Sequence, residues 1–274
     1  MKIYGYHWQF AHNVVKYIRS LKGETMPKFF VKTNQIEENK IKIIDEDVKH
    51  INQVLRAKVG EELTICNLDT TLNYITTISQ ITPEYVMCDI QDCIKSFVES
   101  KVHVTIFQGL PKADKMEYII QKSTELGAVK IVPVEMVRCV VKLDNKKEDK
   151  KIERWERIIY EAAKQSKRGK IPKLTGVLTF KEALADMQNN DLNLCPYENE
   201  RTISIKEAIK DSSANTIGIF VGPEGGFEEE EIEKIQEIDG KVVSLGPRIL
   251  RTETASVVAS SIVLYELSDL GGNI

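Results

Sequence analysis

The first segment with the composition of a binding site is a glycine-rich loop, GPEGGF, at residues 222–227. It directly follows an apolar run at residues 217–221. Three glycines within five residues let the backbone approach a ligand closely and direct successive N–H groups at it. The glutamates at residues 228–231 suit the positive end of the helix expected next and would repel a phosphate. The loop therefore predicts a site for a ligand without phosphate; the alternative is a tight strand-to-helix turn.

A second loop, LGPRILRTETA at residues 245–255, also lies between a predicted strand and a predicted helix. Its glycine and proline fix a turn, and Arg248 and Arg251 stand three residues apart. Thr252 or Thr254 can cap the helix. The alternative is that the arginines are surface charges and the threonine only a cap. Neither loop fits GxGxxG or GxxxxGK[ST], which disfavours dinucleotide and P-loop sites.

A third feature is a concentration of positive charge. Residues 138–173 hold 13 Lys or Arg against six acidic residues, a local net charge of +7 in a chain of net charge −3. A second basic segment, PKADK at 111–115, comes at the end of a predicted strand. These segments favour contact with a phosphate backbone, and a solvated helix face is the alternative.

The elements that position these segments lie after residue 100. Apolar strand-like runs at 102–107, 129–134, 192–194, 217–221 and 242–245 alternate with helical patterns. One helix has a capping-box-like start at Asp114 and Glu117 and a stop at Gly127. Another carries Ile152, Trp155, Ile159, Ala162 and Ala163 on one face. The last helix is expected from about Thr254, with Ala255, Val258, Ala259, Ile262 and Val263 inward. This alternation predicts an α/β fold with a mostly parallel sheet, whose ligands lie beyond the carboxyl ends of the strands.

The pattern of apolar residues before residue 100 is different. Short apolar runs at 29–31, 41–44, 63–66, 74–78 and 85–90 are separated by turn-forming or charged residues. They predict a small β-barrel with one helical piece around residues 47–55. Residues 26–100 carry net charge −4, so this region as a whole does not attract RNA.

Composition excludes several classes of protein. The 274 residues are 42% hydrophobic and 29% charged, which suits a folded chain with a real core. Five scattered cysteines without a CxxC pair indicate reduced thiols and a cytoplasmic protein, and four histidines leave little for a metal site. No apolar run is long enough for a membrane span. Residues 1–25 lack the apolar core of a signal peptide, and MPKFF at Met26 has the character of a natural start. We expect residues 1–25 to be an extension without an assigned function.

Taken together, the motifs carry a family resemblance. In chain order, the motifs MPKFF, HINQVLR, QGLPKADKMEYIIQKSTELG, RWERIIYEAAKQSKRGKIP, GPEGGF and LGPRILRTETA, together with their spacing, resemble the bacterial 16S ribosomal RNA uracil-N3 methyltransferases of the SPOUT superfamily. The resemblance covers residues 26–270. It implies a PUA-like β-barrel at 26–98 and a SPOUT α/β domain at 101–274 with a C-terminal trefoil knot, a rare topology. It also implies S-adenosylmethionine (SAM) as methyl donor, a homodimer, and a uridine in the decoding region of the small subunit.

Carried over by motif, the donor pocket is assigned to Leu194, Pro196, Val221, Gly222, Pro223, Glu224, Gly225, Gly226, Leu245, Gly246, Ile249, Leu250, Thr254 and Ala255. The residues expected to contact RNA are Lys28, Arg56, Lys112, Lys115, Arg138, Lys164, Arg168 and Arg248. No metal is implied. The chain departs from the usual pattern at Glu228, where serine is common, at Ala113, where glycine is common, and at Lys28, where arginine is common.

Uracil N3 carries a proton that must leave before methylation, so a base or a cation beside the developing oxyanion would help. Arg251 is the candidate cation, and it can instead orient a phosphate of the RNA. Glu253 or Glu224 is the candidate proton acceptor. The alternative for Glu253 is a helix-terminal carboxylate paired with Arg248 or Arg251. Two other functions stay open at this point: a non-catalytic RNA-binding assembly factor, and a methyltransferase for another RNA position such as a ribose 2′-oxygen.

Overall fold

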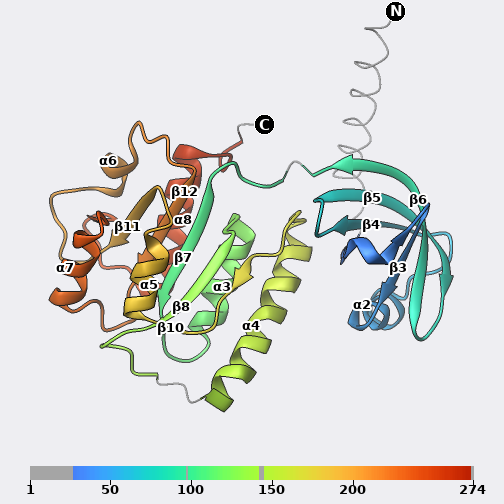
Figure 1. Ribbon diagram of the computed structural model, residues 1–274, viewed down its shortest axis with the longest axis horizontal. Helices are drawn as coiled ribbons and strands as arrows, with labels where there is room; N and C mark the ends of the chain where they lie inside the picture. Colours follow the sequence, from blue (N-terminus) through green and yellow to red (C-terminus); the bar gives the residue numbers. More distant parts are fainter. Residues whose placement is uncertain (1–26, 97, 142–144, 273–274) are drawn as a thin grey trace, which may run out of the picture. The chain divides into compact units, whose positions relative to one another are not determined.

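The computed structural model describes residues 27–96, 98–141 and 145–272, with side chains of 145–147 left aside. The chain divides into two compact units whose boundary lies between Val98 and Glu99 (Figure 1). Each unit has its own hydrophobic core and is described by itself.

The first unit is one six-stranded sheet with strand order β1-β4-β5-β6-β3-β2. Its strands are β1 (Lys28–Val31), β2 (Ile36–Glu37), β3 (Lys40–Ile44), β4 (Glu62–Asn67), β5 (Leu72–Ile81) and β6 (Tyr85–Lys95). The pair β1–β4 is parallel, and the other pairs are antiparallel. Each of the five predicted apolar runs falls inside one of these strands. In β3 the alternation is direct: Ile41 and Ile43 are buried while Lys40 and Lys42 are exposed.

The helical piece of this unit comprises α2 (Glu46–Lys49) and the π-type turn η2 (His50–Leu55), close to the predicted 47–55. A 3₁₀ turn, η1 (Thr33–Gln35), connects β1 to β2. Phe29 and Ile51 are fully buried in the core of the unit. Arg56 ends η2 in the left-handed conformation, with φ of 52°.

The second unit contains a seven-stranded sheet in which every described pair is parallel, as predicted. The strand order is β10-β8-β7-β12-β11-β13, and β9 pairs with β8. The strands are β7 (His103–Gly109), β8 (Lys130–Glu135), β9 (Lys173–Leu174), β10 (Leu178–Thr179), β11 (Leu192–Pro196), β12 (Thr216–Val221) and β13 (Lys241–Val243).

Both faces of this sheet are covered, which is why its central strands are apolar throughout. Phe107 of β7 and Phe220 of β12 face one core, while Ile106 and Ile219, one residue earlier in each strand, face the other. The helices are α3 (Lys115–Leu126), α4 (Asn145–Gln165), α5 (Phe180–Met187), α6 (Ile205–Ile209), α7 (Glu229–Glu237) and α8 (Thr252–Leu267). Helices α3, α4, α5 and α7 contribute buried side chains to the first core, and α6 and α8 to the second.

Several predicted details of these helices are corrected. The Asp114 side chain makes no capping hydrogen bond, and Glu117 instead accepts a hydrogen bond from Arg154 at 2.7 Å. Helix α3 does end at Gly127, in the left-handed conformation. Helix α8 begins at Thr252, and neither of the two threonines proposed as its cap occupies the cap position, which is Arg251.

The buried face of α8 is also more polar than predicted. Ala259 and Val263 are buried as expected, but Val258 is only half-buried. Ser256 and Ser260 are fully buried instead. The apolar pattern gave most of the buried face, with Ala255 and Ile262 also packed on the core, but missed these two serines, whose hydroxyls have hydrogen-bond partners inside the unit.

Candidate functional site

A cleft of about 510 Å³ opens at the carboxyl edge of the second sheet, beyond the ends of β11, β12 and β13. The parallel direction of these strands brings the loops that follow them to the same edge. The predicted donor-pocket residues that line the cleft are Pro196, Val221, Gly222, Pro223, Glu224, Gly226, Leu245, Gly246, Ile249, Leu250 and Ala255. The structure thus brings together the two loops that the sequence singled out.

Three other residues predicted for the pocket do not line the cleft. Leu194 is fully buried inside β11. Gly225 packs against Arg138, where an added Cβ would come within 2.8 Å of the arginine side chain. Thr254 is exposed in the first turn of α8.

The loop after β12 turns tightly at Gly226. This residue has φ of +72°, and a Cβ there would stand 2.4 Å from Oε1 of Glu198. Its N–H donates to the carbonyl of Pro223 at 3.0 Å. A residue other than glycine would be strained in conformation and would clash with the Glu198 side chain.

The loop after β13 is more open. Gly246 has φ of +114°, and a Cβ there would meet no atom within 4 Å. Arg248 is exposed, and Ile249 is 82% exposed. Within the part of the chain that the structure describes, the backbone N–H groups of Arg248, Ile249 and Leu250 have no hydrogen-bond partner in the protein. This wall therefore offers backbone donors to a ligand.

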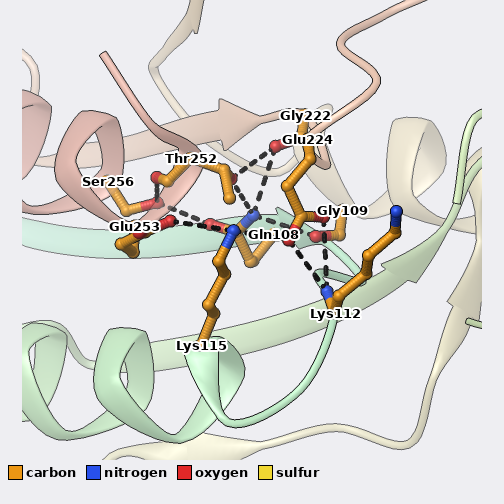
Figure 2. Close-up of polar contacts among 9 residues, drawn as sticks. All are labelled: Gln108, Gly109, Lys112, Lys115, Gly222, Glu224, Thr252, Glu253 and Ser256. Atoms are coloured by element: carbon orange, nitrogen blue, oxygen red, sulfur yellow. Dashed lines mark hydrogen bonds and ion pairs between the residues drawn. The ribbon is translucent and has the colours of Figure 1, made fainter. Parts of the chain in front are cut away.

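A buried polar network joins the two loops behind the cleft (Figure 2). Gln108, the penultimate residue of β7, is fully buried, and its Nε2 donates to Gly109 O and to Thr252 Oγ1, both at 2.9 Å. The Thr252 hydroxyl in turn donates to Gly222 O at 2.6 Å. Ser256 donates to Oε1 of Gln108. Sequence reasoning missed Gln108 and Ser256; the signal was a glutamine at the end of the apolar strand VTIFQG.

A charged cluster lies beside this network (Figure 2). Lys115 Nζ lies 2.8 Å from Oε1 of Glu224 and 3.7 Å from Oε2 of Glu253. Glu224 also accepts from the backbone N–H of Lys112, with its two oxygens at 3.0 and 3.3 Å. Lys115 was expected to contact RNA; the structure pairs it with the two candidate bases. The predicted alternative that Glu253 pairs with Arg248 or Arg251 is wrong, because its partner is Lys115.

The charges of this cluster reinforce one another. Burial alone would raise the pKa of Glu224, but the hydrogen bonds from Lys115 and the backbone outweigh it, and the pKa lies below its ordinary value. The hydrogen bond to Glu224 raises the pKa of Lys115. Oε2 of Glu253 is buried and lacks a hydrogen-bond partner within the described chain. Lys115 Nζ forms an ion pair with this oxygen but is too far away for a hydrogen bond, so a ligand N–H would supply the missing donor.

The residues predicted to contact RNA fall into two groups. Arg248 and Lys112 are exposed near the cleft, and Arg56 is exposed in the first unit. Lys28 and Lys164 are buried, and Nζ of Lys164 lies 3.6 Å from Oε1 of Glu161. The prediction of an RNA contact is corrected for these two, because a buried side chain cannot reach a phosphate.

The predicted RNA contact of Arg168 is corrected in the same way. Its side chain is 3% exposed and donates from Nε and Nη2 to the carboxylate of Glu99, at 2.9 and 2.8 Å. Nη1 donates to the carbonyls of Thr124 and Ala128 at 2.8 and 3.1 Å. Although burial opposes it, the bonds from Arg168 hold the pKa of Glu99 below its ordinary value. Arg168 is therefore a structural residue.

Arg138 fixes the glycine-rich loop from the outside. Its Nε and Nη2 donate to the Glu228 carboxylate at 2.8 and 3.0 Å, and Nη1 donates to Gly225 O at 3.0 Å. The hydrogen bond to Glu228 raises the pKa of the arginine. Glu228, which departs from the usual serine, thus has a defined partner in this chain.

Among the described residues there is neither a helix fit to span a membrane nor a cluster fit to hold a metal ion. No helix among them combines the length and the apolar character needed to cross a bilayer. No group of three or more His, Cys, Asp or Glu side chains in residues 27–272, outside the undescribed gaps, is arranged to hold a metal ion. All five cysteines lie in the described ranges as free thiols.

A parallel sheet covered on both faces, with a cleft between two loops at its carboxyl edge, defines an α/β protein of the ligand-binding class. The model of the RNA methyltransferase domain family matches residues 98–264, more than half of the chain. The chain belongs to this RNA methyltransferase family.

Several similar proteins share one name, ribosomal RNA small subunit methyltransferase E. Ribosomal RNA small subunit methyltransferase E of Bacillus subtilis is 39% identical over 256 residues, which cover 90% of this chain and 100% of that protein. The protein of the same name from Mesomycoplasma hyopneumoniae is 32% identical over 232 residues, covering 85% and 96%. A crystal structure of the Neisseria gonorrhoeae enzyme of this name, bound to S-adenosyl methionine, aligns with a TM-score of 0.79 at 30% identity, covering 89% and 99%.

Proposed function

We propose that this protein is a SAM-dependent methyltransferase that methylates N3 of a uridine in 16S ribosomal RNA of the small subunit. The observation that carries the proposal is the cleft between residues 222–226 and 245–250, at the edge of the sheet where ligands of α/β proteins bind. Relatives that this chain matches over nearly their whole length are named for the small-subunit RNA, and a structural neighbour was crystallised with SAM.

The lining combines apolar surface with backbone hydrogen-bond donors, which suits a nucleoside ligand. Leu245, Ile249 and Phe227 supply apolar surface, and the unpaired N–H groups of residues 248–250 supply donors. At Gly246 the space where a side chain would extend is open. Three glutamates in the first turn of α7 would repel a phosphate group. These residues fit SAM, and we assign its binding to the two loops.

SAM, when bound, supplies an electrophilic methyl group. The chain must position the uracil, accept the proton of N3 and exclude water. Glu253 is our first choice as proton acceptor, because its buried Oε2 lacks a hydrogen-bond partner among the described residues. Glu224 is the weaker base, since both its oxygens accept hydrogen bonds and its pKa is lowered. Arg251, exposed in the cleft lining, is placed to stabilise negative charge on the base or to orient a phosphate.

The fold assignments belong to the same proposal. In the first unit, β1 and β2 lie at opposite ends of the strand order. A flat six-stranded sheet would hold them about 24 Å apart, whereas residues 32–35 leave a connection that spans at most about 18 Å. The sheet must therefore curl, which supports a PUA-like barrel at residues 26–98.

The second unit supports a SPOUT domain at residues 101–274 with a trefoil knot. Strand β13 lies at the sheet edge beside β11, yet the next helix, α8, packs against β7 and β12 in the centre. The chain thus returns from the edge to the middle of the sheet after β13, as a knotted end requires. We also propose a homodimer in the cytoplasm; the five free thiols suit a reducing compartment.

The test uses the whole protein with tritiated SAM and small ribosomal subunits from a strain that lacks the modification. Label in 3-methyluridine of the 16S RNA supports the proposal, and nuclease mapping identifies the nucleotide. Label in a 2′-O-methylated nucleoside would transfer the activity to ribose. Absence of both label and donor binding would leave an RNA-binding assembly factor as the function.

A further inference from the structure

We propose that Gln108 is a positioning residue that sets the separation of the two cleft walls and so controls affinity for the methyl donor. The inference rests on the proposed function, because it assumes that the donor binds between the loops. Gln108 is fully buried and does not line the cleft, so it acts through the residues that do. Gln108 begins the motif QGLPKADKMEYIIQKSTELG, but the sequence alone assigned it no role.

The position of Gln108 in the sheet explains its reach. It pairs in register with Val221, the last residue of β12, so its side chain lies where the glycine-rich loop begins. Nε2 lies 3.4 Å from the carbonyl oxygens of both Val221 and Gly222, and 2.9 Å from Thr252 Oγ1 at the start of α8. One amide group thus contacts the beginning of the glycine-rich loop and the start of the helix that follows the second loop (Figure 2).

The two walls meet at a single carbonyl. Gly222 O accepts from the Thr252 hydroxyl at 2.6 Å and lies within reach of Gln108 Nε2. Gly222 and Thr252 both line the cleft. Because Gln108 donates to the Thr252 hydroxyl, that hydroxyl must direct its own hydrogen to Gly222 O. The glutamine therefore fixes the direction of the bond that joins the walls.

The chemistry of this position requires an amide. Nε2, the donor end of Gln108, faces four oxygens: the carbonyl oxygens of Gly109, Val221 and Gly222 and the hydroxyl of Thr252. Oε1, the acceptor end, accepts a hydrogen bond from the Ser256 hydroxyl. A carboxylate would set negative charge against those oxygens, and an apolar side chain would leave buried groups without partners. At this length an amide has an acceptor end and two N–H donors, one more than a protonated carboxyl group would have.

The experiment compares wild type with Gln108→Met and Gln108→Glu by calorimetric titration of S-adenosylhomocysteine, with thermal unfolding measured in parallel. We expect each variant to bind about tenfold or more weakly, since a lost buried partner costs about one factor of ten or more. The matched control is Asn193→Leu. Asn193 is a buried amide of β11 that donates to Met187 O at 2.9 Å and accepts from Asn190, away from the cleft. It should lower the melting temperature and leave the affinity of the folded protein unchanged.

A second pair of variants tests the same bond without changing Gln108. Thr252→Ser keeps the hydroxyl and should bind the ligand nearly as wild type, whereas Thr252→Val removes it and should lose about tenfold. Combined with Gln108→Met, Thr252→Val should add little, because both changes break one network. This pair decides the question if a Gln108 variant does not fold.

The outcomes separate the inference from the proposed function. Wild-type binding with equal affinity in Gln108→Met, or equal affinity in Thr252→Val and Thr252→Ser, overturns the positioning role and leaves the methyltransferase proposal standing. A wild-type protein that does not bind S-adenosylhomocysteine overturns both. Loss of affinity in Asn193→Leu equal to that in Gln108→Met would also overturn the role, because general destabilisation would then explain both.

Discussion

Replacing Arg168 by methionine should destabilise the second unit strongly, because it removes a buried cation. The change deletes two bonds to the Glu99 carboxylate and two bonds to the carbonyls of Thr124 and Ala128. Breaking a buried ion pair from one side costs about 3–5 kcal/mol. Glu99 retains the backbone N–H groups of Gly169 and Lys170, so we expect the lower end, about 3 kcal/mol.

Thermal and urea unfolding of the full chain measure this loss. For a unit of this size, about 3 kcal/mol lowers the melting temperature by roughly 6–12 °C. Arg154→Met is the matched control, since Arg154 is an exposed arginine whose pair with Glu117 should contribute no more than about 1 kcal/mol. The double variant Arg168→Met with Glu99→Met should lose less than the sum of the single losses, because the two side chains are coupled.

The pH dependence gives an independent measure. The pKa of Glu99 is lowered in the folded chain, so its contribution is present above its ordinary pKa of 4.5 and is lost as pH falls through the folded value. This acid-side loss should be smaller in Arg168→Met. An Arg168→Met protein that melts within about 1 °C of wild type but binds 16S RNA more weakly would refute the structural role and restore the RNA contact.

Three further changes test the cleft. Glu253→Gln should lower the single-turnover rate about 10²-fold or more with little change in S-adenosylhomocysteine affinity, because an amide cannot accept the N3 proton; an unchanged rate in quenched assays would remove Glu253 from the chemistry. Arg138→Ala should cost at most about 1 kcal/mol in urea unfolding, because its pair with Glu228 is about 40% exposed, and Arg138→Lys should not restore the bidentate contact. Gly226→Ala should cost about 1–3 kcal/mol from its φ and weaken ligand binding further through the clash with Glu198. Gly60→Ala, with φ of +95° and no nearby atom, should show only the conformational cost in thermal unfolding and no change in calorimetric affinity.

Five of the seven strands of the second sheet could be predicted, because each apolar run is recognisable from its own residues; β9 and β10, with two residues each, were missed. Strand β12 is buried on both faces, and its continuous apolar sequence indicates this without knowledge of its neighbours. Helices α5 and α6 were missed although each begins with a capping box, Thr179 with Glu182 and Ser204 with Glu207. These helices have eight and five residues, too short for a clear apolar period.

The two loops of the cleft could also be predicted, since glycine and proline fix local geometry. The charged residues could not be placed in the same way. Arg168 and Glu99 are 69 positions apart, and nothing local marks an arginine whose carboxylate lies so far away along the chain. Gln108 was missed for the same reason, because its partners Thr252 and Ser256 come from the last helix.

The sequence distance across the polar network has a consequence for biosynthesis. The contact between Gln108 and Thr252 spans 144 positions, and that with Ser256 spans 148. Contacts this distant form after local ones, and a nascent chain emerges from its amino-terminal end. On the ribosome, β7 and β12 can therefore pair before α8 has been translated, while the cleft walls are still unjoined. Under the proposed donor assignment, a nascent chain therefore has no joined donor cleft until Thr252 and Ser256 have left the exit tunnel.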